Sequence, residues 1–386
     1  MVDLSFCLKR VVLVLNLVCF SLYSQKTKET FLFVGSFTNG EIGNGIHVYT
    51  FNQQNGSSEL VHSENGLINS SFLALSPNGK YLYAATDTQL KTEGYVSSFY
   101  VDSETGNLKF LNKQLAGGRN PVHINLHPKG EFLINSNYTD AGISLFPIKE
   151  DGTLSAYTEL FTFEGSSVLQ PRQDKAHVHS SNFSPKGDYL FVMDLGTDKI
   201  YSFKVENDQV GKNTLVKRES IQTVKGSGPR HLTFHPTRNY VYAVNELNGS
   251  VTAYKYENGN LISLQNILCY EKGVKVFQSA DIHCSPDGKF LYVSNRGSEE
   301  NSIVIFSIEA NSGRLELVGR TPTFGEHPRS FAIDPSGKFL LVANQFTNNI
   351  IVFKRDAKTG LLTKTNNDIE VNAPASLKMF SYFLSN

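Results

Sequence analysis

The chain has 386 residues, with 36 basic and 36 acidic side chains, so its formal net charge at pH 7 is zero. A balanced charge provides no field that would attract nucleic acid or an anionic membrane surface, and we expect neither as a partner. The chain is long for one domain, but a repeat architecture can hold this length in a single unit.

The first 24 residues have the pattern of a secretory signal peptide. Lys9 and Arg10 precede a short apolar run, polar sequence follows it directly, and cleavage is plausible after Ser24. The run is too short for an ordinary membrane-spanning helix. We therefore predict a signal peptide at 1–24, a mature domain at 25–386 and a periplasmic or secreted location, with an uncleaved anchor as the alternative.

Two strand-like runs follow, at Phe31–Ser36 and Gly45–Phe51, and after them one motif recurs six times. Each copy joins an apolar strand to an aromatic-rich strand through a proline turn, which is typical of a β-hairpin. The copies lie at 70–87, 121–138, 178–195, 226–246, 279–296 and 328–345. Their turn prolines are Pro77, Pro128, Pro185, Pro236, Pro286 and Pro335, with spacings of 51, 57, 51, 50 and 49 residues. A period near fifty with strands and no helical pattern predicts a β-propeller.

Two further strand-like runs follow each copy, so one blade is expected to contain four antiparallel strands. The runs at Phe31–Ser36 and Gly45–Phe51 match the second and third strands of a blade that lacks its first strand. Ala373–Phe380 resembles an opening strand with no partner after it. We therefore predict an all-β, seven-bladed propeller, closed by pairing of the strand near 373–380 with the strand near 31–36. Closure of this kind removes free sheet edges.

Differences between the repeats indicate individual roles, because equivalent positions lie at one height around the axis of a propeller. Six residues before the turn proline stand Ser71, Val122, His179, Arg230, Ala280 and Arg329. Ten residues after it stand Asp87, Tyr138, Leu195, Glu246, Arg296 and Gln345. We expect the ionisable members, His179, Arg230, Glu246, Arg296 and Arg329, to meet at one mouth of the channel.

This set has a chemical interpretation. Arginines that face a common cavity bind a carboxylate or phosphate through two parallel hydrogen bonds. A histidine beside a glutamate provides a proton-transfer pair near neutral pH. The alternative is purely structural, with Glu246 forming salt bridges between blades. His123 and His231, one position further along the strand, are expected to point away and to form hydrogen bonds within the sheet.

Metal and nucleophile chemistry find little support. His177 and His179 form an HxH pair, but no third ligand is visible nearby, so no metal is expected. The chain has no Gly-x-Ser-x-Gly elbow and no phosphate loop, so a hydrolase here would activate water. Cys269 and Cys284 remain after signal removal; a disulfide is conceivable, but two buried thiols are favoured.

The motifs GPRHLTFHPTRNYVYAVNE, ADIHCSPDGKFLYVSNR and HPRSFAIDPSGKFLLVANQ resemble the seven-bladed propeller lactonase family, typified by bacterial 6-phosphogluconolactonase and related to the fungal carboxymuconate-lactonising enzyme. The resemblance covers nearly all of the chain after the signal. It implies that His179, Arg230, Glu246 and Arg296 are the catalytic residues. It also implies that Arg329 and Asp194 contact the substrate, and that no cofactor or metal is needed.

The expected function is hydrolysis of a small, anionic, sugar-type lactone. The two catalytic arginines would hold the substrate and its developing oxyanion, and Glu246 is favoured over His179 as the base because flanking arginines keep a carboxylate ionised. Two alternatives stay open: a cycloisomerase that uses the same residues, and a non-catalytic propeller that binds a ligand or protein partner. A cytoplasmic phosphorylated lactone would not meet an exported enzyme. The sequence does not determine the lactone or the oligomeric state.

Overall fold

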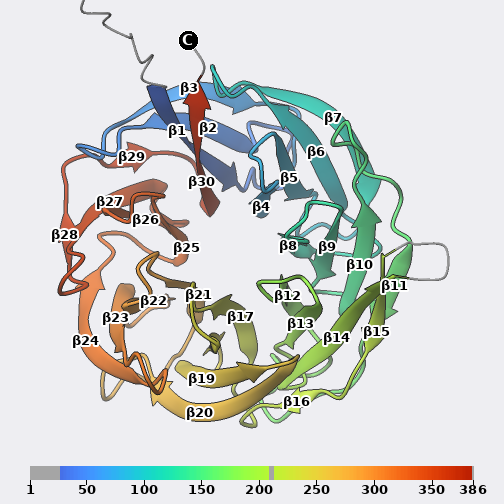
Figure 1. Cartoon of the computed structure of the whole chain (residues 1–386), viewed down its shortest axis with the longest axis vertical. Helices are drawn as coiled ribbons and strands as arrows, with labels where there is room; N and C mark the ends of the chain where they lie inside the picture. Colours follow the sequence, from blue (N-terminus) through green and yellow to red (C-terminus); the bar gives the residue numbers. More distant parts are fainter. Residues whose placement is uncertain (1–26, 208–212, 385–386) are drawn as a thin grey trace, which may run out of the picture.

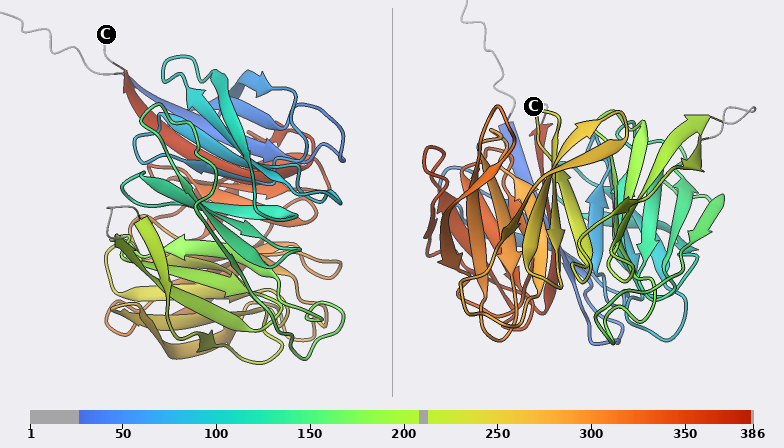
Figure 2. Two further views of the ribbon diagram at one scale, coloured as in Figure 1. Left: turned by 90° about the vertical axis from the view of Figure 1, so that its right-hand side faces the viewer. Right: turned by 90° about the horizontal axis from the view of Figure 1, so that it is seen from below.

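The computed structural model describes residues 27–207 and 213–384, and the predicted signal peptide lies outside these ranges. The described residues form β-strands and no α-helix, arranged as seven sheets around a central axis (Figure 1). Both side views show the sheets standing around the axis of a thick ring (Figure 2). The predicted all-β, seven-bladed propeller is confirmed.

Each blade runs from an inner strand at the channel to an outer strand at the rim. From inside to outside, the first three blades contain β30 (Pro374–Leu384), β1 (Thr27–Ser36), β2 (Ile46–Phe51) and β3 (Ser58–Glu64); β4 (Phe72–Leu75), β5 (Tyr81–Thr86), β6 (Tyr95–Val101) and β7 (Leu108–Leu115); and β8 (Pro121–Leu126), β9 (Phe132–Asn137), β10 (Gly142–Pro147) and β11 (Glu159–Thr162).

The other four blades follow the same order. They contain β12 (Val178–Phe183), β13 (Tyr189–Asp194), β14 (Lys199–Asn207) and β15 (Asn213–Lys217), with β16 (Ile221–Gln222) on β14; β17 (Pro229–Phe234), β18 (Tyr240–Asn245), β19 (Ser250–Glu257) and β20 (Asn260–Leu268); β21 (Ser279–Cys284), β22 (Phe290–Asn295), β23 (Ser302–Ile308) and β24 (Leu315–Pro322); and β25 (Pro328–Ile333), β26 (Phe339–Asn344), β27 (Asn349–Arg355) and β28 (Leu362–Lys364), with β29 (Ile369–Glu370) on β27.

The ring closes through the first blade, as predicted. β30 pairs antiparallel with β1 along its whole length, so that Phe31 lies opposite Phe380 and Val34 opposite Leu377. The two ends of the described chain therefore share one sheet and lie side by side (Figure 1). Pairing of the terminal strands leaves the ring without an open seam between its first and last blades.

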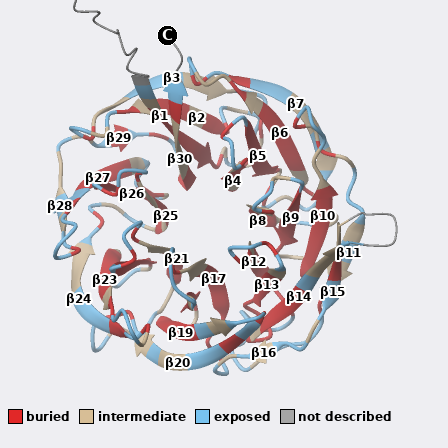
Figure 3. Cartoon of the chain, in the orientation of Figure 1, coloured by how far each residue is buried: buried red, intermediate tan, exposed pale blue. Residues whose placement is uncertain are grey.

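The hydrophobic core lies between neighbouring blades. The inner and middle strands are buried, whereas exposed residues gather on outer strands such as β7, β20 and β24 (Figure 3). Buried tyrosines on second strands donate hydrogen bonds to turns of the next blade: Tyr83 Oη lies 3.2 Å from Gly152 O, and Tyr242 Oη lies 3.0 Å from Gly313 O. Each contact satisfies a buried hydroxyl and fixes one blade against its neighbour.

The inner strands carry a repeated irregularity that positions the site. In β8, β12, β17, β21 and β25 the pairing with the second strand shifts near the first residues, as at a β-bulge. The residues at the shift include His179 in β12, Arg230 in β17 and Arg329 in β25. A bulge re-aims side chains and ends regular alternation, so two consecutive residues can face the channel.

Cys269 and Cys284 are free thiols in the structure, and both lie in or against the core between the fifth and sixth blades. The favoured prediction of two buried thiols is confirmed for Cys269, which is buried, whereas Cys284 is a free thiol that is only partly buried. In the described parts of the chain, no helix is long and apolar enough to cross a membrane.

Candidate active site

The candidate site lies at the end of the channel where inner strands begin and second strands end. β17 pairs with β18 so that Pro229 lies opposite Asn245, which brings Arg230 and Glu246 to the same end of one blade. β21 and β22 pair in the same way and bring Arg296 to this end of the next blade. The positions singled out from the repeats therefore converge through the register of the sheets.

Glu246 is the centre of an arginine cluster. Its side chain is 3 % exposed, with Arg172 Nη2 at 2.6 Å from Oε1. Arg230 Nε lies 3.0 Å and Arg296 Nη2 3.2 Å from Oε2. Burial opposes ionisation of this carboxyl, but the guanidinium groups of Arg296, Arg172 and Arg230 outweigh it and lower the pKa of Glu246 to about 2. The carboxylate is therefore fully ionised near neutral pH and has both oxygens occupied.

Arg329 adds a fourth cation to this end of the channel. Its guanidinium stacks over the ring of Phe37 at 5.3 Å from the centroid. Burial and the like charges of Arg296 and Arg230 lower the pKa of Arg329. Three guanidinium groups thus contact the Glu246 carboxylate and that of Arg329 is close enough to feel their charge, so the local charge is positive. An anion or a developing negative charge on a ligand would be stabilised here.

His179 is buried in the same region, with 6 % exposure. Its ring lies 5.3 Å from that of His231 and 5.5 Å from that of Tyr138. Burial, followed by the charge of Arg230, holds the pKa of His179 well below its usual value, so the imidazole is neutral. Its buried Nδ1 has no hydrogen-bond partner among the described residues, which leaves this nitrogen free of any scaffold role.

A large polar cavity lies at this end, and one residue of its lining, Phe37, contacts Arg329; none of the arginines lines it. It has a volume of about 800 Å³ and lies between the β1–β2 loop and the residues that follow β5 and β26. Its lining is rich in amide side chains: Asn39, Asn69, Gln89, Gln345, Asn348 and Asn372. Phe37 and Phe346 belong to the same lining. Phe37 contacts Arg329, and Phe346 stacks on His327 with centroids 4.1 Å apart.

His327 connects this lining to the arginine cluster. Its Nε2 lies 3.0 Å from Arg296 Nη1, an N–H donor, so Nε2 accepts and the ring is neutral. Burial and the charge of Arg296 lower the pKa of His327 to about 2.

Asp194 has a different environment from that expected of a substrate contact. It is fully buried, and one oxygen accepts from the backbone N–H groups of His177 and Gly196 at 2.8 and 3.0 Å. The other oxygen accepts from Thr197 Oγ1 at 2.7 Å. These contacts favour a role in holding the turn after β13, and direct contact with substrate stays an untested prediction.

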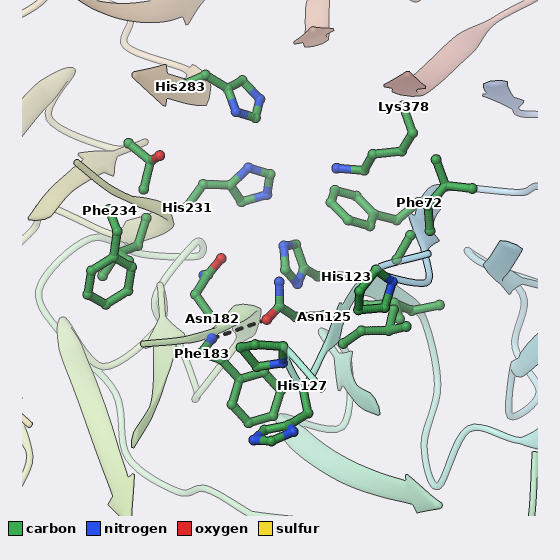
Figure 4. Close-up of a pocket in the computed structure, with 18 of the residues that line it drawn as sticks. Phe72, His123, Asn125, His127, Asn182, Phe183, His231, Phe234, His283 and Lys378 are labelled. Carbon is green, nitrogen blue, oxygen red and sulfur yellow. Dashed lines mark hydrogen bonds between the residues drawn. The ribbon is translucent and has the colours of Figure 1, made fainter. Parts of the chain in front are cut away.

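The expectation for His123 and His231 is wrong. Both line a second cavity, of about 520 Å³, inside the channel toward the opposite end (Figure 4). The expectation assumed strict alternation along the strand. The bulges after Pro121 and Pro229 break that alternation and direct these imidazoles into the channel.

Sequence reasoning missed two groups that complete the site. Arg172 lies outside the repeated motif, in the long connection between β11 and β12. The spacing of 57 residues between turn prolines in this blade, longer than in the others, indicates an insertion there. Asp281 follows no motif, but its Oδ1 lies 2.9 Å from His231 Nδ1, and His231 Nε2 lies 3.1 Å from Arg230 Nη1. These buried contacts, from Asp281 through His231, hold the side chain of Arg230 in position.

His177 shows where the second histidine of the HxH pair lies. It stacks on Tyr138 with centroids 4.5 Å apart, and its Nε2 is 3.3 Å from Asp174 Oδ1. The described residues contain no cluster of three or more His, Cys, Asp or Glu side chains suited to a metal ion.

The fold and the site define a seven-bladed propeller with a candidate site for a polar ligand. At one end of the channel, a buried Arg–Glu–His centre lies near an amide-lined cavity. Residues 31–379 match the family model described as "Lactonase, 7-bladed beta-propeller". The chain belongs to this family.

Individual relatives agree with the family match. The chain is 53 % identical over 351 residues to the 6-phosphogluconolactonase of Formosa agariphila, covering 91 % of this chain and 99 % of the relative. A putative 6-phosphogluconolactonase from Bacteroides fragilis superposes with a TM-score of 0.86 at 36 % identity, covering 91 % of this chain and 98 % of the other. The periplasmic gluconolactonase of Pseudomonas aeruginosa gives a TM-score of 0.86 at 32 % identity, covering 92 % and 99 %.

Proposed function

We propose that the protein hydrolyses a sugar-type lactone at the mouth formed by His179, Arg230, Glu246 and Arg296. One observation carries the proposal most directly: three guanidinium groups contact a single buried carboxylate, and the fourth, that of Arg329, stacks on Phe37, which lines a cavity with six amide side chains. The guanidinium groups match a carbonyl that becomes an oxyanion, or an anionic substituent. The amides match the hydroxyl groups of a sugar ring. The activities for which these relatives are named, 6-phosphogluconolactonase and gluconolactonase, support the same class.

In the proposed reaction, water attacks the lactone carbonyl carbon and its proton passes to His179. Arg230 and Arg296 stabilise the oxyanion; one well-placed donor of this kind contributes about 3 kcal/mol. The oxyanion collapses, the ring C–O bond breaks, and the protonated imidazole returns its proton to the leaving alkoxide. The product is the open-chain hydroxy acid.

This assignment of the base departs from the sequence-based preference for Glu246. A carboxylate with a pKa of about 2 has little affinity for a proton, and both of its oxygens already accept from arginines. An effective base has a pKa nearer the working pH. His179 is neutral with a free Nδ1, and an anionic substrate beside it would raise its pKa by offsetting the arginine charges. Glu246 then serves to hold the arginines in place.

The substrate range is tested with a panel of phosphorylated, free and carboxylated sugar lactones, following acid release at constant pH. The proposal requires ring opening of at least one sugar lactone, and Arg230→Lys should lower turnover because an ammonium cannot reproduce the two-pronged contact. Arg314→Lys, at an exposed position, is the matched control. Identification of the product separates hydrolysis from cycloisomerisation. Binding without turnover across the panel would indicate a non-catalytic propeller.

We also propose that residues 1–24 are removed on export and that the enzyme acts in the periplasm, where a free sugar lactone is the accessible substrate. The N-terminal sequence supports this, and the Pseudomonas relative is named as periplasmic. The mass of the mature protein, purified from fractionated cells, tests it: an intact N-terminus in the cytoplasmic fraction would contradict export.

A further inference from the structure

The second cavity, in the channel and away from the arginine cluster, is lined by groups that the proposed reaction does not use. It measures about 520 Å³ and is bounded by inner strands from several blades, including β4, β8, β17, β21 and β30. Figure 4 shows Lys378, His123 and His231 pointing toward one another across it. A volume of this size falls in the range of small-molecule sites.

Lys378 is the cation of this cavity. Its Nζ lies 4.7 Å from the centroid of the Phe72 ring. Among the described residues, it has no salt-bridge partner within 4.0 Å and no hydrogen-bond acceptor. A lysine has three N–H donors, and an aromatic face offers them no lone pair. Acceptors for this ammonium group must therefore come from whatever occupies the cavity.

The neighbouring polar groups are also donors. His123 Nδ1 accepts from the backbone N–H of Ser181 at 3.4 Å, which places the ring proton on Nε2. Asn125 Oδ1 accepts from the backbone N–H of Phe183 at 3.1 Å, which leaves its amide NH₂ group without a partner among the described residues (Figure 4). Together with Lys378, these side chains offer several hydrogen-bond donors to one space.

The carboxylate in the lining, that of Asp281, is occupied by hydrogen-bond donors other than Lys378, His123 and Asn125. Asp281 is 5 % exposed and already accepts from His231 Nδ1 at 2.9 Å and from His283 Nε2 at 3.2 Å. It also accepts from the backbone N–H of Ile282 at 3.0 Å, from Ser330 Oγ at 3.1 Å and from the backbone N–H of Phe331 at 3.2 Å. Five donors fill the lone pairs of its two oxygens, so Asp281 accepts nothing further from the cavity.

We propose that this cavity is a second ligand site that binds a small oxyanion, a carboxylate or a phosphate, through Lys378, His123 and Asn125. The donors of Lys378, His123 and Asn125, beside a carboxylate that is already occupied, are complementary to an acceptor-only anion. The aromatic face of Phe72 provides an apolar wall for the carbon atoms of an organic acid. The site lies beyond the Asp281–His231 pair from the arginine cluster, so it is separate from the proposed hydrolytic centre.

Protection of Lys378 from acetylation tests the proposal on the full-length wild-type protein. The protein is treated with limiting acetic anhydride, alone and with sodium gluconate or sodium phosphate, at constant ionic strength set with sodium chloride, and lysine modification is read by peptide mass spectrometry. An anion at ten times its Kd should slow acetylation of Lys378 about tenfold. Lys354, an exposed residue of β27, is the internal control and should react at an unchanged rate.

The anion that protects identifies the ligand chemistry: gluconate indicates a carboxylate, phosphate indicates a phosphate, and protection by both indicates a general oxyanion site. Unchanged acetylation of Lys378 with both anions would overturn the proposal.

In calorimetric titrations Lys378→Met should weaken binding of the protecting anion at this site about tenfold or more, and Lys354→Met should not. Lys378→Met should keep lactone turnover. Wild-type stoichiometry and affinity in Lys378→Met would also overturn the proposal.

Discussion

Replacing Glu246 by Gln tests the role of the buried carboxylate as the anchor of the arginine cluster. The pKa of Glu246 is about 2 instead of 4.5, a difference of about 2.5. At about 1.4 kcal/mol per pKa unit, ionised Glu246 contributes about 3 kcal/mol to the free energy of unfolding at pH 7. Removal of one partner from a buried ion pair costs a similar amount, about 3–5 kcal/mol. Glu246→Gln should therefore lose about 3 kcal/mol of stability.

The stabilisation by Glu246 depends on pH, and the direction of its pKa shift determines how. Because the pKa is lower in the folded state, the stabilisation is complete above pH 4.5 and is lost as the pH falls from 4.5 toward 2. Gln does not titrate, so the difference between the wild type and Glu246→Gln should shrink over that window. Urea unfolding at pH 7, 5, 4 and 3 measures it, with Glu316→Gln, at an exposed position of β24, as the control. Equal stability of Glu246→Gln and the wild type at pH 7, or a difference that does not change with pH, would refute the reasoning.

Four further outcomes are expected. His179→Asn should lower kcat about 100-fold or more with a small change in KM, in initial-rate assays, because the proton acceptor is lost; a wild-type kcat would remove His179 from the mechanism. Arg172→Ala should raise KM about tenfold in the same assays but cost less than about 1 kcal/mol of stability, because its side chain is 44 % exposed; an unchanged KM would exclude it from substrate binding. Asp281→Asn should lower kcat about tenfold through misplaced Arg230, with melting followed in parallel; an unchanged kcat in the folded variant would show that the Asp281–His231 contact does not position Arg230. Deletion of residues 373–386 should abolish cooperative unfolding followed by near-ultraviolet circular dichroism, because β30 completes the first blade; a truncated chain that melts like the full chain would contradict this.

The architecture could be predicted from the sequence because each blade repeats the same hairpin motif. The recurring proline turns and aromatic second strands fix the hairpins, and the unpaired strand near residue 373 predicts the closure with the strand near residue 31. Glu246 and Arg296 could be placed at one mouth for the same reason, since equivalent positions share a height around the axis. These predictions required the repeat alone.

The parts that the sequence could not give depend on departures from the repeat. His231 was expected to point away because a regular strand alternates, and the bulge after Pro229 reverses this. Arg172 comes from an insertion that has no counterpart in the other blades. The preference for Glu246 as the base depended on a qualitative effect of neighbouring charge; the three contacts with arginine show how far that effect lowers its proton affinity.

The bulges also explain how one channel can serve two sites. In a regular inner strand only every second residue faces the channel, so two consecutive residues would not both face it. At the bulge of β17 two consecutive side chains face inward: Arg230 contacts Glu246 at the mouth, and His231 lines the inner cavity while contacting Asp281. His231 also accepts from Arg230, so the residue that borders the second cavity fixes a guanidinium of the first site. Displacement of His231 would therefore remove one hydrogen-bond acceptor of Arg230.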